Sequence, residues 1–376
     1  MAEDAKERRL NGLRVVFNKP RVVAEVGQGR CWYPDIIKFS TGELMLNYSL
    51  NADTNENEHN SQAVHISTDG GRTFDFTYDV NGFHNGGGEP RISLEDGRIV
   101  GASTFLKPAP KGQGRCFLAH RWTYDHGGRC CTVEPWGALV EGLPREVAPY
   151  PKVSRTWWCR INWFSDILLV ADGFWISTLS LRYGGDQRET TVALISENEG
   201  RLWRYLSTIA GADAVPDAKE GFDEPCLVQL ENGNLMCVSR VGSGQPLARS
   251  YSSDGGKSWS ALDRLPAYSV APQLCRTRSG TLVLSTGRPG VFLWFSTDPR
   301  GENWQSIDVL AHHNSTLDAA SQMEAKQTTA YTAMVEVDDD RVFLVYDRTP
   351  FAWEPVPAGS GERAQILLLE FSVKRQ

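Results

Sequence analysis

The hydrophobic and polar positions along the chain repeat a single hairpin pattern. An apolar run is followed by a two-residue turn, usually ending in glycine, and then by a second apolar run. Glycine supplies the positive φ that a tight turn needs, so each copy predicts a β-hairpin. The six copies are PDIIKFSTGELMLNYS from Pro34, PRISLEDGRIVGAST from Pro90, SDILLVADGFWISTLS from Ser165, PCLVQLENGNLMCVSR from Pro225, PQLCRTRSGTLVLSTG from Pro272 and YTAMVEVDDDRVFLVYD from Tyr331.

The copies recur about every 59 residues, since their first residues run from 34 to 331 in five steps. This length holds four strands with their loops, which is the content of one propeller blade. Two strand-like runs remain, RVVAEV from Arg21 and QILLLEFSV from Gln365. They can pair with each other or complete one shared blade, which removes exposed edges. We therefore predict an all-β fold, a six-bladed β-propeller of one domain over residues 1–376, with the terminal strands closing the ring.

A second repeated element lies between the hairpins and follows the pattern Ser-x-Asp-x-Gly-x-x-aromatic. In such a turn the Asp side chain bonds its own downstream backbone, glycine takes the strained position and the aromatic ring packs on the sheet. These residues are therefore expected to be structural. Clean copies begin at Ser67 and Ser252, and variants begin at Ser196, Ser296 and Thr123.

This turn element resembles the Asp box of the sialidase (neuraminidase) superfamily, whose members are six-bladed propellers with Asp boxes (BNR repeats) in most blades. The resemblance covers nearly the whole chain, because the boxes are in step with the six hairpins. It implies a sialidase-like fold and, as an expectation, glycoside hydrolase activity.

Composition and charge exclude several other classes of function. The formal net charge of −7 argues against a nucleic-acid partner, which would need a basic face for the phosphates. No apolar run approaches the ~18 residues that a membrane helix requires. The N-terminal MAEDAKERRLNGL lacks the apolar centre of a secretory signal, which predicts a cytoplasmic protein. A secreted or periplasmic protein whose signal had been removed would give the same pattern, and the sequence does not indicate an oligomeric state.

The eight cysteines form no CxxC pair and no disulfide framework, so reduced thiols are expected. The seven histidines show no HExxH or other metal-ligand spacing. We therefore predict neither a metal nor a cofactor.

The ends of the hairpins opposite their turns predict a candidate site. In an antiparallel hairpin, the residue before the first strand and the residue after the second lie at the same end. In a closed propeller these ends converge around the central axis. The pairs are Glu224 with Arg240, Tyr331 with Asp347, Ala271 with Arg288, Trp163 with Arg182, Glu89 with Thr104, and Trp32 and Tyr33 with Leu50 and Asn51.

This rim combines residue types that suit an acidic sugar. Arginine forks bind carboxylates bidentately. A tyrosine beside a carboxylate can act as a nucleophile, because the carboxylate takes its proton. Sialidases are the glycosidases that use tyrosine in this way. Trp32, Tyr33 and Trp163 are candidates for stacking on the apolar face of the sugar, with Glu89 on the same rim.

The resemblance assigns roles to five of these residues. Tyr331 in AYTAMVEV resembles the nucleophile of the family, and Glu224 in FDEPCLVQL resembles its glutamate partner. Arg240 and Arg288 are placed like members of the arginine triad that binds the sialic-acid carboxylate. Asp347 in LVYDR stands where the family has a glutamate that orients the first arginine of the triad.

The first blade departs from the family pattern. The family reads Y-R-I-P, whereas this chain reads Cys31-Trp32-Tyr33-Pro34, so Trp32 replaces the expected arginine. Arg30 lies two positions earlier and reaches the site only if the loop differs.

The general acid is expected in the polar loop after the first hairpin. The spacing of the family favours Asp53, and Glu56 and Glu58 also qualify. A loop this acidic is also typical of plain solvated surface.

These residues predict a retaining exo-glycosidase that removes a terminal sialic acid or related acidic sugar from a glycan. Tyr331 attacks the anomeric carbon with Glu224 as its base, and Asp53 protonates the leaving oxygen. The alternatives are a non-catalytic carbohydrate-binding propeller, a glycosidase for another sugar, a propeller-fold polysaccharide lyase and a protein-interaction platform.

Overall fold

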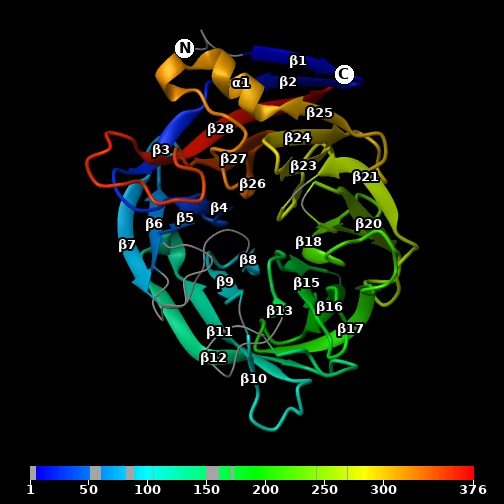
Figure 1. Cartoon of the computed structure of the whole chain (residues 1–376). Coiled ribbons are helices and arrows are strands. Elements are labelled where there is room, and N and C mark those ends of the chain that lie inside the picture. Colours follow the sequence, from blue (N-terminus) through cyan, green and yellow to red (C-terminus); the bar gives the residue numbers. More distant parts are fainter. Residues whose placement is uncertain are drawn as a thin grey trace.

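The computed structural model describes residues 6–50, 61–81, 89–104, 106–149, 161–170, 173–242, 244–268 and 270–376. β-Sheets are arranged radially around a common centre (Figure 1). The α-helix α1 (Val309–Thr316) lies at the rim beside β24 and β25. Within the described residues, no helix has the length and hydropathy needed to cross a bilayer.

Blades 1 to 3 follow one another along the chain. Blade 1 consists of β4 (Trp32–Lys38), β5 (Leu44–Ser49), β6 (Ser61–Ser67) and β7 (Asp75–Asn81). Blade 2 consists of β8 (Arg91–Ser93), β9 (Ile99–Ala102), β11 (Phe117–Tyr124) and β12 (Cys131–Glu141), with β10 (Lys107–Pro108) added beside β11. Blade 3 consists of β13 (Ile161–Asn162) and β14 (Leu168–Leu169), which both pair with β15 (Trp175–Leu181), then β16 (Thr190–Ser196) and β17 (Leu202–Ala210). The outer strands β12 and β17 pair in parallel, so blades 2 and 3 share one continuous sheet.

Blades 4 to 6 complete the ring. Blade 4 consists of β18 (Asp223–Gln229), β19 (Leu235–Arg240), β20 (Pro246–Ser252) and β21 (Asp263–Tyr268). Blade 5 consists of β22 (Gln273–Arg276), β23 (Leu282–Gly287), β24 (Val291–Ser296) and β25 (Gln305–Asp308). Blade 6 consists of β26 (Thr332–Asp338), β27 (Arg341–Arg348) and β28 (Ala364–Arg375), extended by strands from the N-terminal segment: β1 (Lys6–Leu10), β2 (Leu13–Phe17) and β3 (Arg21–Val26).

The six predicted hairpins are present, and the fold is the predicted sialidase-like six-bladed β-propeller. Each hairpin pairs its two strands antiparallel: β4 with β5, β8 with β9, β14 with β15, β18 with β19, β22 with β23 and β26 with β27. These hairpins form the inner part of their blades, and β18, β22, β26 and β4 contact one another in that order.

Strands from the two ends of the chain meet in blade 6. β3 and β2 both pair antiparallel with β28, the last strand of the chain. Both possibilities that the sequence left open for RVVAEV and QILLLEFSV are observed, because the two strands pair directly and belong to one shared blade. The edge of β28 is therefore covered by N-terminal backbone rather than exposed to solvent.

The hydrophobic core lies between neighbouring blades. Separate buried clusters fill the spaces between blades 1 and 2, 2 and 3, 3 and 4, 4 and 5, 5 and 6, and 6 and 1. The cluster between blades 6 and 1 packs Phe343 and Ile366 against Ile36 and Leu46. Because this last space is filled like the other five, burial of apolar surface holds the ring closed.

The Ser-x-Asp-x-Gly turns have the hydrogen bonds expected of a structural turn. In the copy at Ser252, the Asp254 carboxylate accepts a hydrogen bond from the Ser252 hydroxyl (2.8 Å) and one from the backbone N–H of Ser258 (2.9 Å). The N–H of Gly256 donates to the Ser252 hydroxyl (2.8 Å). Hydrogen bonds from Ser258 and Ser252 lower the pKa of Asp254 to about 2. The Asp254 carboxylate therefore accepts hydrogen bonds from residues of its own turn, as expected for a structural residue.

Two adjacent glycines of this turn give a matched test of the packing between blades. Both have positive φ, but a Cβ on Gly256 would lie 2.6 Å from the Cδ1 of Ile176 in blade 3, whereas one on Gly255 meets nothing within 4 Å. We expect Gly256→Ala to lower the free energy of unfolding by about 2–4 kcal/mol, from backbone strain and overpacking together. Gly255→Ala should cost only the strain, about 1 kcal/mol. Equal losses in urea denaturation would show that the contact between blades is not tightly packed.

Candidate active site

The side chains of Tyr331 and Glu224 are joined by a short hydrogen bond. Tyr331 immediately precedes β26, and Glu224 is the second residue of β18. The tyrosine hydroxyl donates to Oε1 of Glu224 at 2.5 Å. Two residues that are 107 positions apart in the chain therefore meet because blades 4 and 6 both direct an inner strand towards the centre.

The other carboxylate oxygen of Glu224 is held by two further donors. Oε2 accepts from Nη1 of Arg240 at 3.0 Å and from the backbone N–H of Ala271 at 2.8 Å. Arg240 also forms an ion pair with Glu220 at 2.7 Å. The side chains of Glu224 and Arg240 are only 5% and 13% exposed. The arrangement fixes the carboxylate and leaves Oε1 directed at Tyr331.

The electrostatics of this group keep Tyr331 protonated in the resting protein. Burial raises the pKa of the Tyr331 hydroxyl well above its usual value, and the negative charge of Glu224 raises it further. Burial lowers the pKa of Arg240, but Glu224 and Tyr331 outweigh this and the net shift is upward. Tyr331 therefore loses its proton only by transferring it to an acceptor in contact, and Glu224 is in that position.

Arg288 and Tyr33 flank the tyrosine. The guanidinium carbon of Arg288 lies 5.6 Å from the centre of the Tyr331 ring, and its Nη2 donates to the Thr329 carbonyl at 3.0 Å. Tyr33 packs edge-on against Tyr331, with ring centres 4.7 Å apart. The structure thus brings together Tyr331, Glu224, Arg240, Arg288 and Tyr33.

Asp347 lies behind this group, but its contacts differ from those expected. Its buried carboxylate accepts hydrogen bonds from the Thr328 hydroxyl and the Thr329 N–H, both at 2.8 Å, from the Thr329 hydroxyl, and from the N–H of Tyr33 at 3.3 Å. No described arginine pairs with it, and the threonines donate to its carboxylate instead, which fits the replacement of the family's arginine by Trp32. A role for Asp347 in substrate binding stays a prediction. Burial raises the pKa of Asp347, although these hydrogen bonds lower it.

The contacts of Asp347 predict that its replacement lowers the stability of the protein. Three of its four donors come from the segment immediately before Tyr331, and an asparagine amide would direct N–H groups at some of the four. We expect Asp347→Asn to lower the free energy of unfolding by about 1–3 kcal/mol. Asp339→Asn on the same hairpin is the control, because Asp339 is 80% exposed and its replacement should change the stability by no more than about 0.5 kcal/mol. Thermal and urea denaturation measure both changes. An unchanged stability of Asp347→Asn would show that the hydrogen bonds of Asp347 do not hold the segment before Tyr331 in place.

Several residues of this group have a left-handed backbone conformation. The φ values are 53° for Tyr33, 44° for Glu224, 38° for Ala271, 55° for Arg288 and 64° for Ala330. Non-glycine residues adopt this region at an energetic cost, and such strain is concentrated at functional sites. At Glu224 the conformation is braced by Asp223, whose carboxylate accepts the Glu224 N–H at 2.8 Å. Burial, followed by the charge of Glu224, raises the pKa of Asp223.

Arg30 and Trp32 lie one layer further out. The guanidinium carbon of Arg30 is 4.9 Å from the centre of the Trp32 ring. Trp32 is only 2% exposed, and it packs edge-on against Trp353 with ring centres 5.3 Å apart. The indole of Trp353 therefore covers Trp32, and Trp32 provides the surface on which the Trp353 ring packs.

Trp163 does not join the site. It is fully buried in the cluster between blades 2 and 3, and its Nε1–H donates to the Ser177 hydroxyl at 2.8 Å. The expectation that Trp163 stacks on a sugar is therefore corrected, because the apolar cluster takes up its ring. Glu89 is buried at the entry to β8, and a role for it stays a prediction. Asp53, Glu56 and Glu58 lie outside the described residues.

Three participants escaped the sequence analysis: Glu220, the N–H of Ala271, and Trp353. Glu220 lies in the irregular segment before β18, where no periodic pattern relates its side chain to that of Glu224. A backbone donor leaves no signal in a sequence. Trp353 lies in a loop rich in proline and glycine that carries no strand pattern.

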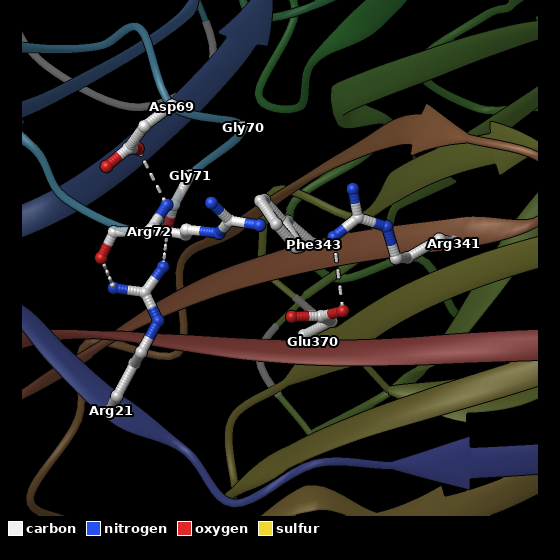
Figure 2. Close-up of a pocket in the computed structure, with 8 residues that line it drawn as sticks. All are labelled: Arg21, Asp69, Gly70, Gly71, Arg72, Arg341, Phe343 and Glu370. Carbon is white, nitrogen blue, oxygen red and sulfur yellow. Dashed lines mark hydrogen bonds and ion pairs between the residues drawn. The ribbon is translucent and has the colours of Figure 1, made fainter. Parts of the chain in front are cut away.

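A separate groove of about 390 Å³ lies between the Asp69–Arg72 turn of blade 1 and strands β3, β27 and β28 (Figure 2). Arg21 donates to the carbonyls of Gly71 and Arg72, and Arg341 pairs with Asp338 and Glu370. The contacts of Arg21 join blade 6 to blade 1, whereas those of Arg341 lie within blade 6. We therefore assign the groove a structural role.

Among the described residues, no group of three or more His, Cys, Asp or Glu side chains could hold a metal ion.

Searches with the sequence found no matching family model and no similar curated protein. Comparison of the structure gave several solved structures of the same fold. A protein of unknown function from Dyadobacter fermentans is 18% identical, with a TM-score of 0.69 over 97% of this chain and 100% of the other.

Two enzymes are also similar to this chain in structure. The Hadza microbial sialidase Hz136 is 16% identical, with a TM-score of 0.60 over 92% of this chain and 65% of the sialidase. The α-L-arabinanase of Penicillium chrysogenum, solved with arabinobiose, is 16% identical, with a TM-score of 0.60 over 94% of this chain and 98% of the arabinanase. At these identities the similarity shows the fold alone, and the similar glycosidases act on different sugars.

Proposed function

We propose that this protein is a retaining exo-glycosidase of the sialidase type that removes a terminal sialic acid or related acidic sugar. The observation that carries this proposal is the 2.5 Å hydrogen bond from the Tyr331 hydroxyl to Glu224. It supplies a nucleophile and its base in direct contact, at the convergence of the inner strands.

In the first step the Tyr331 oxygen bonds to the anomeric carbon, and its proton passes to Oε1 of Glu224. The glycosidic bond breaks, and the leaving oxygen takes a proton from a general acid, for which Asp53 remains our candidate. In the second step the general acid, now deprotonated, takes a proton from water, whose oxygen attacks the anomeric carbon, while the Tyr331 oxygen leaves and takes back its proton from Glu224. Two displacements at one carbon retain its configuration.

A tyrosine nucleophile suits a sugar with an anionic group next to its anomeric carbon. A carboxylate nucleophile would be repelled by such a group, whereas a protonated tyrosine approaches it uncharged. Arg288 is the candidate partner for the anionic group of this sugar, since no carboxylate among the described residues pairs with it. Arg240, in contrast, is already paired with two glutamates.

The pairing of Arg240 and the replacement of an arginine by Trp32 favour a second candidate, a glycosidase for a neutral sugar. The test is fluorophore release from an aryl α-sialoside and from an aryl α-L-arabinofuranoside, each with wild-type protein and Tyr331→Phe. Turnover of the sialoside that depends on Tyr331 supports the proposal, and turnover of only the arabinofuranoside supports the second candidate. A folded protein that binds these sugars and releases no aglycone would be a carbohydrate-binding propeller.

A further inference from the structure

Trp353 is an exposed indole beside the proposed nucleophile. Its side chain is 42% exposed, whereas its neighbours Trp32 and Tyr33 are 2% and 7% exposed. The Trp353 ring packs on the edge of Trp32 and lies 6.4 Å from Tyr33, which in turn contacts Tyr331. The aromatic cluster therefore presents one ring to solvent, and that ring is Trp353.

The loop that carries Trp353 is held from two sides. On one side, Gly29 and Val356 exchange backbone hydrogen bonds of 3.0 and 2.7 Å, which join the loop to the segment before Trp32. On the other side, the N–H of Thr349 donates to the carbonyl of Gln327 at 2.8 Å, close to the segment that leads into Tyr331. An exposed aromatic ring on a braced loop loses little conformational freedom when a ligand binds, which favours affinity.

Arg288 lies close to both this ring and the tyrosine. Its guanidinium carbon is 5.0 Å from the centre of the Trp353 ring and 5.6 Å from that of Tyr331. A ligand that contacts both rings is therefore close to this cation. An indole face buries apolar C–H surface, while a guanidinium binds a carboxylate with two parallel hydrogen bonds.

We infer that Trp353 is a further substrate-binding residue, on whose indole the apolar face of the sugar stacks while the anionic group of that sugar lies at Arg288. This inference deepens the proposed function, and it rests on that function for the acidic sugar and for the reacting residue. It moves the stacking role from the buried Trp32 and Trp163 to Trp353.

Binding is measured in the Tyr331→Phe background, which separates it from catalysis. The probes are the methyl α-glycoside of N-acetylneuraminic acid and methyl α-L-arabinofuranoside, titrated by ligand-observed NMR. We expect the sialoside to bind, and Trp353→Ala to raise its Kd on the order of 30-fold, because an exposed aromatic anchor contributes about 2 kcal/mol. Trp353→Phe should restore the Kd to within about 5-fold of the parent. Tyr268→Ala, which removes an aromatic ring of similar exposure (44%) from β21, is the matched control and should leave the Kd unchanged.

Three results would overturn the inference: no binding of the sialoside, binding that Trp353→Ala leaves unchanged, or binding of the arabinofuranoside alone. Failure of the proposed function looks different. In that case the sialoside binds through Trp353, but wild-type protein releases no aglycone from the aryl sialoside.

Discussion

Tyr331→Phe is expected to lower kcat for the glycoside that the wild-type protein turns over by a factor on the order of 10³ or more. The hydroxyl is the atom that forms the covalent bond in the proposed mechanism, and Glu224 has no other proton to take. KM should change little, because the ring and its contact with Tyr33 remain. Release of fluorophore from the aryl glycoside measures both parameters.

Tyr251→Phe is the matched control for this variant. Tyr251 is also partly buried, and its hydroxyl donates to the Arg300 carbonyl at 2.8 Å in another part of the ring. Its replacement removes the same atom and should leave kcat unchanged. Tyr331→Phe also removes the donor to Oε1 of Glu224, so we expect it to lower the free energy of unfolding by about 1–2 kcal/mol. Full activity in a folded Tyr331→Phe protein would rule out tyrosine as the nucleophile.

Arg240→Leu is expected to produce the largest loss of stability, about 3–5 kcal/mol in the free energy of unfolding. The substitution leaves the buried Glu224 carboxylate with hydrogen-bond donors but without its charge partner. Turnover should be lost as well, because the carboxylate then moves towards solvent and away from Tyr331. Urea denaturation measures the stability without any assumption about the substrate.

The control for Arg240→Leu is Arg278→Leu. Arg278 pairs with Asp339, and both side chains are mostly exposed (77% and 80%). Surface ion pairs contribute little, so the loss should be below about 1 kcal/mol. If the two variants lost stability equally, the Arg240–Glu224 pair would not be buried as the structure has it.

The fold could be predicted because its signals are local and repeated. Each hairpin combines apolar runs with a turn residue that tolerates positive φ. Because this pattern occurs six times, the prediction does not depend on any single copy. The meeting of Tyr331 and Glu224 could also be predicted, because it depends on which end of each hairpin faces the centre. Both are properties of the backbone path, which hydrophobic pattern and chain spacing determine.

The features that the sequence did not predict correctly depend on the direction of side chains and on local backbone conformation. Trp163 lies at the end of a hairpin like Tyr331 does, yet it points into the space between two blades, where apolar side chains bury it. Asp347 occupies the expected position, but the threonines before Tyr331 provide its partners. Tyr33 and Glu224 have left-handed backbone conformations where the chain turns at the rim. The sequence does not indicate these conformations, because neither residue is a glycine.

Trp353 could not be predicted for a different reason. It lies in a loop whose path is set by backbone hydrogen bonds to Gly29 and Gln327, far away in the sequence. An aromatic residue in such a loop has no periodic pattern that would place it near Tyr331. Only the closed ring, which places blade 6 beside blade 1, brings its ring onto Trp32.

The central claim is that Tyr331 forms a covalent bond to the sugar. The most direct test is mass spectrometry of the protein after reaction with a fluorinated sialosyl fluoride, which forms the glycosyl-enzyme quickly and releases it slowly. The account predicts one added glycosyl group per chain, located on the peptide that contains Tyr331 and absent from Tyr331→Phe. A label on Glu224, or an unlabelled protein that still turns over the aryl sialoside, would contradict it.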